Sequence, residues 1–176
     1  MTAADGSAGG EVDAGPTRFA ALRAVRTATI HLHASPDRVF RLFTPEGERA
    51  WVPGWDPVHR HPAGGGIEPG AVFVTRGHGA EVETVWMVTR YDPAALHATY
   101  NRVTPGLHAV VVDVACVGAA EGGTLARVGY TYTALSEDGN ATIARQTDGA
   151  YAAMMGEWES AINAYLRGTR AAGSTA

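Results

Sequence analysis

The chain has 176 residues, of which 45% are hydrophobic and 18% are charged, a composition typical of a soluble globular protein and unlike that of a disordered or fibrous one. A chain of this length is expected to form one domain with a sizeable core. No stretch approaches the ~20 apolar residues of a membrane span, so we expect no membrane-spanning segment.

The basic residues are all arginines, fourteen in number, and the chain contains no lysine. This absence excludes a Schiff-base nucleophile, a pyridoxal attachment site and a Walker-type phosphate-binding lysine. The arginines form no run or stripe, so no nucleic-acid partner is expected. The single cysteine, Cys116, lies in an apolar stretch, which favours a buried structural thiol and a reduced, cytoplasmic location.

The two ends of the chain are predicted to be disordered tails. Residues 1–18 are rich in Ala, Gly and Asp and contain no apolar run, which is unlike a secretory signal. Residues 19–168 are expected to form the single domain, and residues 169–176 a C-terminal tail. Nothing in the sequence indicates an oligomeric state.

The ordered part is expected to begin with a strand over about residues 24–33, followed by two short helices. Ser35 and Thr44, each followed by proline, are predicted to cap these helices with their side chains. The Trp-rich segment 51–57 cannot be regular structure, because three helix- and strand-breaking residues fall in its second half. A short edge strand is expected over residues 58–61.

From residue 71 onward, apolar residues alternate with a period of two, and short turns separate the runs, which predicts an antiparallel meander. The expected strands cover residues 71–76, 81–91, 96–103, 107–117 and 124–135. One long amphipathic helix is expected over residues 141–167, ending at Gly168. The predicted fold class is therefore α+β, with a curved antiparallel sheet of about seven strands wrapped around a long C-terminal helix, and two short helices after the first strand.

This order of elements resembles the START-like, or SRPBCC, helix-grip superfamily with its Bet v 1-like fold. The resemblance also rests on the opening strand running into Ser35-Pro36-Asp37-Arg38-Val39-Phe40, on the Trp-rich loop, and on the Tyr-containing last strand before the helix. It covers about residues 23–167. Members include polyketide cyclases/aromatases, lipid-transfer domains and plant ligand binders, so the resemblance implies a cavity for a hydrophobic small molecule but leaves enzyme and binder open.

The wall of such a cavity is expected to consist of aromatic side chains with polar tips, a flexible methionine and one arginine. The candidate ligand-binding residues are Trp51, Trp55, Trp86, Tyr100, Arg102, Tyr130, Met154 and Trp158. The same aromatic residues would also suit an ordinary core. If Arg127 faces water, Tyr130 and Tyr132 both point inward, and two inward phenols favour a cavity because each buried hydroxyl needs a partner. Arg102 either pairs with an anionic or enolate oxygen of a ligand or lies at the surface.

The histidines supply the other candidate site. In a strand, His59 and His61 project to one face, here predicted to be the concave one, and with Tyr132 they are the candidate catalytic residues. With His78 and Glu83 they are candidate ligands of a divalent metal, zinc or iron. The alternatives are a metal-free acid/base role and a pair of edge-strand histidines bonded to backbone or water. The other histidines are expected at the surface or rim: His31, His33, His97 and His108.

The functional prediction is the binding of a hydrophobic or aromatic small molecule in an internal cavity. One of the activities that the resemblance allows is that of a polyketide cyclase/aromatase-like enzyme in which His or Tyr side chains transfer protons. The alternatives are a non-catalytic carrier of an apolar ligand and a metal-dependent enzyme built on the His-x-His pair. No nucleotide or flavin is implied, so the expected cofactor is either none or a divalent metal.

Overall fold

The computed structural model describes residues 19–76 and 82–173. Seven strands form one antiparallel sheet in the order β1-β7-β6-β5-β4-β3-β2. The strands are β1 (Arg23–Leu32), β2 (Val58–His61), β3 (Val72–Arg76), β4 (Glu83–Asp92), β5 (His97–Thr104), β6 (His108–Gly118) and β7 (Thr124–Ala134). The helices are α1 (Pro36–Phe40), α2 (Pro45–Glu48), α3 (Glu137–Ala144) and α4 (Asp148–Gly173), with a 3-10 turn, η1 (Arg41–Phe43), after α1.

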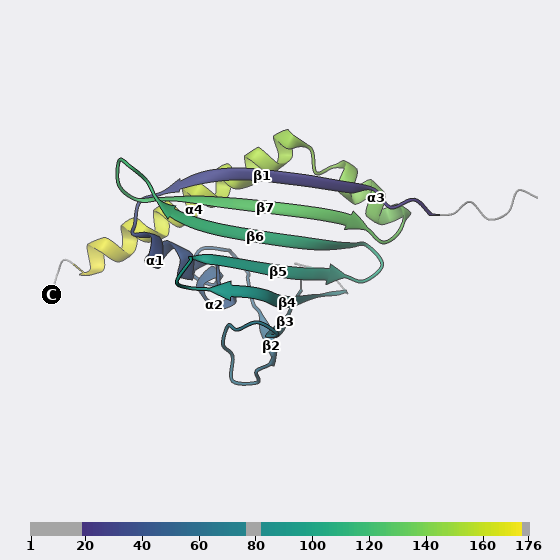
Figure 1. Cartoon of the computed structure of the whole chain (residues 1–176), viewed down its shortest axis with the longest axis horizontal. Helices are drawn as coiled ribbons and strands as arrows, with labels where there is room; N and C mark the ends of the chain where they lie inside the picture. The colour runs from purple at the N-terminus through teal and green to yellow at the C-terminus, as the bar shows by residue number, and fades with distance from the viewer. Residues whose placement is uncertain (1–18, 77–81, 174–176) are drawn as a thin grey trace, which may run out of the picture.

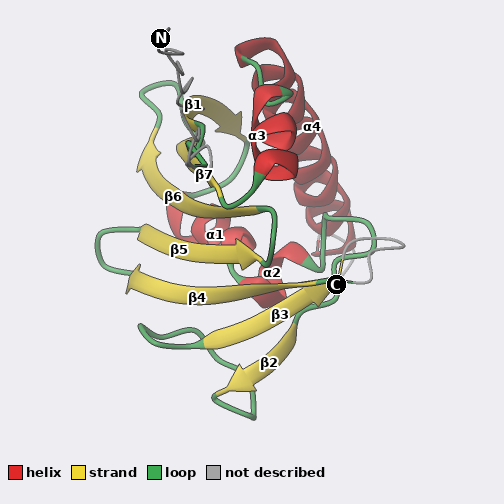
Figure 2. Cartoon of the chain, turned by 90° about the vertical axis from the view of Figure 1, so that its right-hand side faces the viewer, coloured by secondary structure: helices red, strands yellow, loops and turns green. Residues whose placement is uncertain are grey.

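The sheet and the helices form two layers. Figure 1 shows the strands in their spatial order from β1 to β2, with α4 running along the far side of the sheet. In the perpendicular view of Figure 2, the sheet curves and the helices all lie on one of its sides, with α4 packed against β1 and α3 against β7. The predicted α+β helix-grip fold is confirmed.

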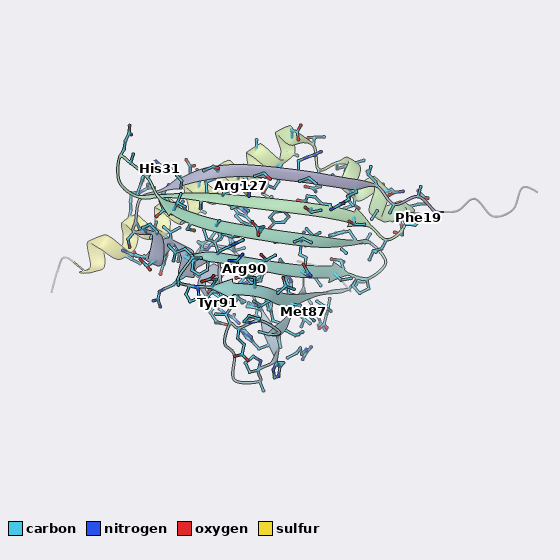
Figure 3. The ribbon with its side chains drawn as sticks, viewed as in Figure 1. Phe19, His31, Met87, Arg90, Tyr91 and Arg127 are labelled. Atoms are coloured by element: carbon cyan, nitrogen blue, oxygen red, sulfur yellow. The ribbon has the colours of Figure 1, made fainter. Side chains whose placement is uncertain are left out.

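The antiparallel register sets which side chains meet on the inward face of the sheet. Two neighbouring rows of cross-strand partners make up its centre: Trp86, Arg102, Val110 and Tyr132 in one, and Val88, Tyr100, Val112 and Tyr130 in the other. Successive residues of a strand point to opposite faces. Tyr130 and Tyr132 are accordingly only 6% and 4% exposed, whereas the Arg127 side chain, labelled on β7 in Figure 3, is 59% exposed. The predicted inward direction of both phenols is confirmed.

The two short helices begin at prolines after Ser35 and Thr44, as predicted. The Thr44 hydroxyl accepts a hydrogen bond from the amide of Gly47 at 3.0 Å, which confirms its capping role. The Ser35 side chain makes no capping hydrogen bond, so that prediction is wrong. Burial of the apolar side chains of Val39 and Phe40 holds α1 against the core instead.

The predicted single helix over 141–167 is in fact two helices. Thr147 interrupts it, because its hydroxyl accepts a hydrogen bond from the amide of Ala150 at 3.1 Å and caps a new helix. At the other end, α4 passes Gly168 and ends at Gly173, so residues 169–173 are helical rather than part of a tail. The Thr169 hydroxyl supports this extension, since it bonds to the Tyr165 carbonyl at 3.2 Å and receives a hydrogen bond from Arg38.

The structure tests the prediction for Cys116 but only part of the predictions for the two ends of the chain. The N-terminal tail predicted for residues 1–18 and the last part of the C-terminal tail predicted for residues 169–176, residues 174–176, lie outside the described residues. Cys116 is buried, and burial raises the pKa of its thiol to about 12, which confirms the structural role predicted for it. Over the described part of the chain, no helix is both long and apolar enough to cross a membrane.

Candidate ligand cavity

A cavity of about 320 Å³ lies between the inward face of the sheet and the helices. Strands β3 to β7 supply one wall, and α2, α3 and α4 supply the other. The short linker between α3 and α4 also borders the cavity, through Gln146. The Gln146 carbonyl oxygen accepts a hydrogen bond from Arg26 Nε at 2.8 Å. The wall is mainly aromatic and aliphatic, which is typical of sites for small apolar ligands.

Most of the aromatic residues predicted from the sequence line this cavity. The predicted residues on its wall are Trp55, Trp86, Tyr100, Arg102, Tyr130, Tyr132, Met154 and Trp158. Trp51 does not line it. The Trp51 indole N–H donates to the Leu42 carbonyl at 2.8 Å, and its ring packs edge-on against Trp158 with centroids 5.1 Å apart. Trp51 therefore supports the wall from behind.

Trp55 and Trp86, near β3 and β4, face the cavity with their apolar rings, because their indole N–H groups are hydrogen-bonded to other protein groups. Trp55 Nε1 donates to the Pro45 carbonyl at 2.7 Å, and Trp86 Nε1 donates to the Thr75 hydroxyl at 2.9 Å. The two indole rings meet edge-on with centroids 5.6 Å apart. Hydrogen-bonded at their tips and packed against each other, they form a rigid apolar surface.

The cavity tyrosines differ in whether their hydroxyls have partners. Tyr100 donates to the Phe43 carbonyl at 2.8 Å, which ties β5 to the 3-10 turn. The hydroxyls of Tyr130 and Tyr132 make no hydrogen bond to any described residue. Burial raises the pKa of both phenols, so both keep their protons at neutral pH. They are therefore available to bind an oxygen atom of a ligand.

Glu48, at the end of α2, is a cavity residue that the sequence analysis missed. A Cβ atom at the preceding residue, Gly47, would lie 1.9 Å from the Arg41 carbonyl oxygen, so only glycine lets α2 pack this closely and hold Glu48 over the cavity. Burial raises the pKa of Glu48 to about 8, and the charge of Arg102 opposes part of that rise. The carboxyl group is thus mainly protonated at neutral pH.

Arg102, on β5, brings a positive charge to the same space. Its guanidinium carbon lies 5.2 Å from the centroid of the Trp86 ring and 5.9 Å from that of the Tyr130 ring, within the range of cation–π contacts. The Arg102 Nε atom is buried and has no hydrogen-bond partner among the described residues. Arg102 also borders a depression on the outside of the molecule, together with Val52, Trp55 and Trp86. It is half-buried in the wall between the two.

His108, at the start of β6, is half-buried and lines the cavity, a role that the sequence analysis did not assign to it. Its Nδ1 atom is buried and accepts or donates no hydrogen bond within the part of the chain that the structure describes. Burial, followed by the charge of Arg102, lowers the pKa of the imidazole, which favours its neutral form. The signal for this position was present in the sequence, because His108 shares the period-two phase of Val110 and Val112.

The predicted His-x-His pair lies outside the cavity wall. His59 is half-buried and its Nε2 atom lies 2.9 Å from Glu46 Oε1, whereas His61 is exposed. The expectation that both face the concave side is wrong, because a β-bulge between the two residues breaks the alternation of the strand. Their proposed catalytic role therefore has no geometric link to the cavity.

The predicted metal ligands are also held by other partners. Glu83 Oε1 lies 2.9 Å from a guanidinium nitrogen of Arg76 and 3.7 Å from one of Arg60, and His78 lies outside the described residues. Within residues 19–76 and 82–173, no group of three or more His, Cys, Asp or Glu side chains is arranged to hold a metal ion. The metal site involving His78 stays a prediction.

Comparison with known proteins agrees with this architecture. The sequence profile of the family described as polyketide cyclase/dehydrase and lipid transport matches residues 23–162. No protein of curated function matches the chain. Among solved structures, norcoclaurine synthase from Thalictrum flavum, a point mutant in complex with a transition-state analogue, has a TM-score of 0.61 at 14% identity over 86% of this chain and 99% of that one.

Two further structures show the same fold. Ginseng major latex-like protein 151 from Panax ginseng has a TM-score of 0.59 at 14% identity, over 82% of this chain and 97% of that one. An uncharacterised protein from Rhizobium leguminosarum has a TM-score of 0.58 at 19% identity, over 84% and 97%. The family profile covers most of the domain. The chain therefore belongs to the polyketide cyclase/dehydrase and lipid transport family, within the START-like (SRPBCC) superfamily.

Proposed function

We propose that the chain binds one small hydrophobic or aromatic molecule in the cavity. The observation that carries this proposal is the cavity of about 320 Å³, walled by aromatic rings and supplied with a few converging polar groups. This volume lies at the lower end of the range of ligand pockets, about 300–1,000 Å³. It suits a compact ligand of about two rings better than a long lipid chain.

The rings of the wall favour a flat ligand. Trp86 stacks on Phe73 with centroids 5.5 Å apart and an interplanar angle of 10°, while Trp55 meets Trp86 edge-on. A planar guest can therefore make edge contacts with one ring and stacked contacts with another, as aromatic groups prefer. The free hydroxyls of Tyr130 and Tyr132 can hydrogen-bond to its oxygen atoms.

A neutral fluorescent probe, N-phenyl-1-naphthylamine, tests this binding. We expect saturable binding with dye emission enhanced and tryptophan emission quenched, because Trp55, Trp86 and Trp158 line the cavity. Val112→Phe fills part of the cavity and should weaken binding at least about tenfold. The matched control is Val111→Phe, since Val111 is the adjacent residue and is 41% exposed on the other face of the sheet. Equal binding by the two variants would argue against the cavity as the site.

The polar groups of the cavity favour a second function, proton transfer to and from the bound molecule. Glu48 holds a proton near neutral pH and His108 is driven toward its neutral form, so the cavity contains an acid and a base together. A general acid and a general base are most effective when their pKa values lie near the working pH. The family description, which names cyclases and dehydrases, supports the same function.

A dehydration illustrates the chemistry that these groups can perform. His108 takes the proton from the carbon next to a carbonyl group, and the charge of Arg102 stabilises the resulting enolate oxygen. The electron pair then forms the carbon–carbon double bond and expels the β-hydroxyl group, which leaves as water with the proton of Glu48. Transfer of the proton from His108 to Glu48 restores both groups. The tyrosine hydroxyls position the substrate.

Variants separate an enzyme from a carrier. For an enzyme, Glu48→Gln and His108→Gln should lower kcat by about 100-fold or more and leave the affinity of the ligand within a few-fold. His59→Ala, outside the cavity, should leave kcat unchanged, and Tyr132→Phe should mainly change KM. For a carrier, the same cavity variants change affinity alone. Loss of activity in His59→Ala with full activity in Glu48→Gln would contradict the assignment of roles.

A further inference from the structure

We propose that the molecule bound in the cavity carries a single negative charge, a carboxylate or a phenolate attached to an aromatic ring, and that this group pairs with Arg102. This inference rests on the proposed function, because it names the class of ligand for the same cavity. It predicts that charge as well as shape decides which molecule binds.

Among the arginines that the structure describes, Arg26, Arg38 and Arg102 are half-buried, and only Arg102 of these three has neither an ion pair nor a hydrogen bond to a described residue. Ion pairs with Asp or Glu are formed by Arg26, Arg49, Arg60, Arg76, Arg90 and Arg127. Arg102 is half-buried and forms no ion pair and no hydrogen bond with the described residues. The Nε–H of Arg102 is removed from water without a partner, which is costly and favours a partner supplied by a ligand.

The protein groups that face Arg102 do not neutralise it at neutral pH. The titratable groups around it are Glu48 on α2, Tyr100 on β5, His108 on β6, and Tyr130 and Tyr132 on β7. Glu48 is mainly protonated because burial raises its pKa to about 8, and burial likewise raises the pKa of the tyrosines. Since the lowered pKa of His108 favours its uncharged form, the cavity holds one net positive charge.

The positions of these groups suit an aromatic anion in particular. The guanidinium group lies over the rings of Trp86 and Tyr130, so a flat ligand can contact those rings and reach Arg102 with an attached oxygen. The proton of Glu48 and the free hydroxyls of Tyr130 and Tyr132 are further donors for the same oxygen atoms. Hydrogen bonds to a charged oxygen are the stronger kind. A neutral ligand would leave Arg102 unpaired.

A matched pair of probes tests the inference, 2-naphthoate and its neutral isostere 2-naphthamide. Their affinities are measured by tryptophan quenching and by calorimetry at pH 7. We expect 2-naphthoate to bind about tenfold more tightly or better. Arg102→Gln, and Arg102→Met as a second variant that keeps the apolar stem, should remove this preference and leave the affinity for 2-naphthamide within about threefold.

The matched control is Arg76→Gln. Arg76 lies in the outer depression beside Arg102 but does not line the cavity, and it already pairs with Glu83 at 2.9 Å. It should leave both affinities unchanged, which separates pairing inside the cavity from general attraction of an anion to a basic surface. A loss of preference in Arg76→Gln as large as in Arg102→Gln would overturn the inference.

The pH dependence of the affinity for 2-naphthoate tests the inference without any substitution of Arg102. Between pH 7 and pH 9 Glu48 loses its proton and places a second negative charge near the bound carboxylate. We expect the affinity for 2-naphthoate to fall at least about fivefold over this range, and the affinity for 2-naphthamide to stay constant. Glu48→Gln should abolish the fall.

The outcomes distinguish this inference from the proposed function on which it rests. Equal affinities for the two probes, or a preference for 2-naphthoate that survives in both Arg102 variants, overturn the anionic ligand and leave the cavity as a binding site for neutral molecules. Failure of N-phenyl-1-naphthylamine and of both naphthalene probes to bind overturns the proposed function itself.

Discussion

Replacing Glu48 with glutamine should stabilise the protein, and by an amount that grows with pH. Burial raises the pKa of this carboxyl group from 4.5 to about 8. Below pH 4.5 it is protonated in the folded and the unfolded chain alike, so it contributes no difference. As the pH rises, the unfolded chain loses the proton first and is favoured. The free energy of unfolding therefore falls as the pH rises from 4.5 to 8.

The magnitude follows from the shift, since each pKa unit corresponds to about 1.4 kcal/mol. At pH 7 the carboxyl group is ionised in the unfolded chain but mainly protonated in the folded one, so the free energy of unfolding is about 3 kcal/mol lower than at pH 4. Above pH 8 this decrease approaches about 5 kcal/mol. Glu48 faces the cavity, and water there screens part of this cost. We therefore expect a measured effect of at least about half these values.

The assay is urea denaturation of the native sequence and of Glu48→Gln at intervals from pH 5 to pH 9. The difference between their free energies of unfolding isolates Glu48, because all other titrating groups are shared. The control is Glu157→Gln, since Glu157 is exposed on α4 and does not line the cavity, so its substitution should not reproduce the stabilisation. A difference between native protein and Glu48→Gln that stays constant within about 0.5 kcal/mol from pH 5 to pH 8 would refute the argument.

Three further predictions concern single groups. Tyr100→Phe should lower the free energy of unfolding by about 1–2 kcal/mol, because it leaves the buried Phe43 carbonyl unpaired. In the same urea titration, Tyr132→Phe should change the free energy of unfolding by less than about 0.5 kcal/mol. Cys116 should resist a disulfide-exchange reagent at pH 8 until the chain is unfolded, and rapid labelling of the native protein would contradict its burial. The metal hypothesis predicts about one equivalent of zinc or iron in untagged protein, lost in His59→Ala; less than about a tenth of an equivalent would reject it.

The fold could be predicted because its signals are periodic and local. Alternation of apolar residues located every strand of the meander, and β2 has the predicted bounds, residues 58–61. The break between α3 and α4 was missed because the apolar face of the helix continues across it. A local signal did exist, since Thr147 followed by Asp148 is a typical helix start.

The cavity could be predicted only in part, for a physical reason. Large aromatic side chains such as Trp86 and Tyr130 are buried in most proteins, so residue type alone placed them on the wall correctly. Glu48 was missed because glutamate is seldom buried, and a four-residue helix carries no periodicity that reveals its inward side. His61 was placed wrongly because a single bulge, invisible in the sequence, reverses the alternation.

Stability alone does not explain two polar groups of the cavity, Glu48, which the sequence analysis missed, and Arg102, which it predicted. Glu48 reaches the cavity only because Gly47 allows α2 to pack against the Arg41 carbonyl, and at neutral pH it costs the fold free energy. Arg102 also has no acidic partner in residues 19–76 and 82–173. An apolar side chain at either position would fill the space at lower cost. Residues that depart from the general rules of folding in this way concentrate at functional sites, because there the free energy of the fold is balanced against binding and chemistry. The departures at Glu48 and Arg102, whose charges interact across the cavity wall, thus support the proposal that these two residues take part in recognising the ligand.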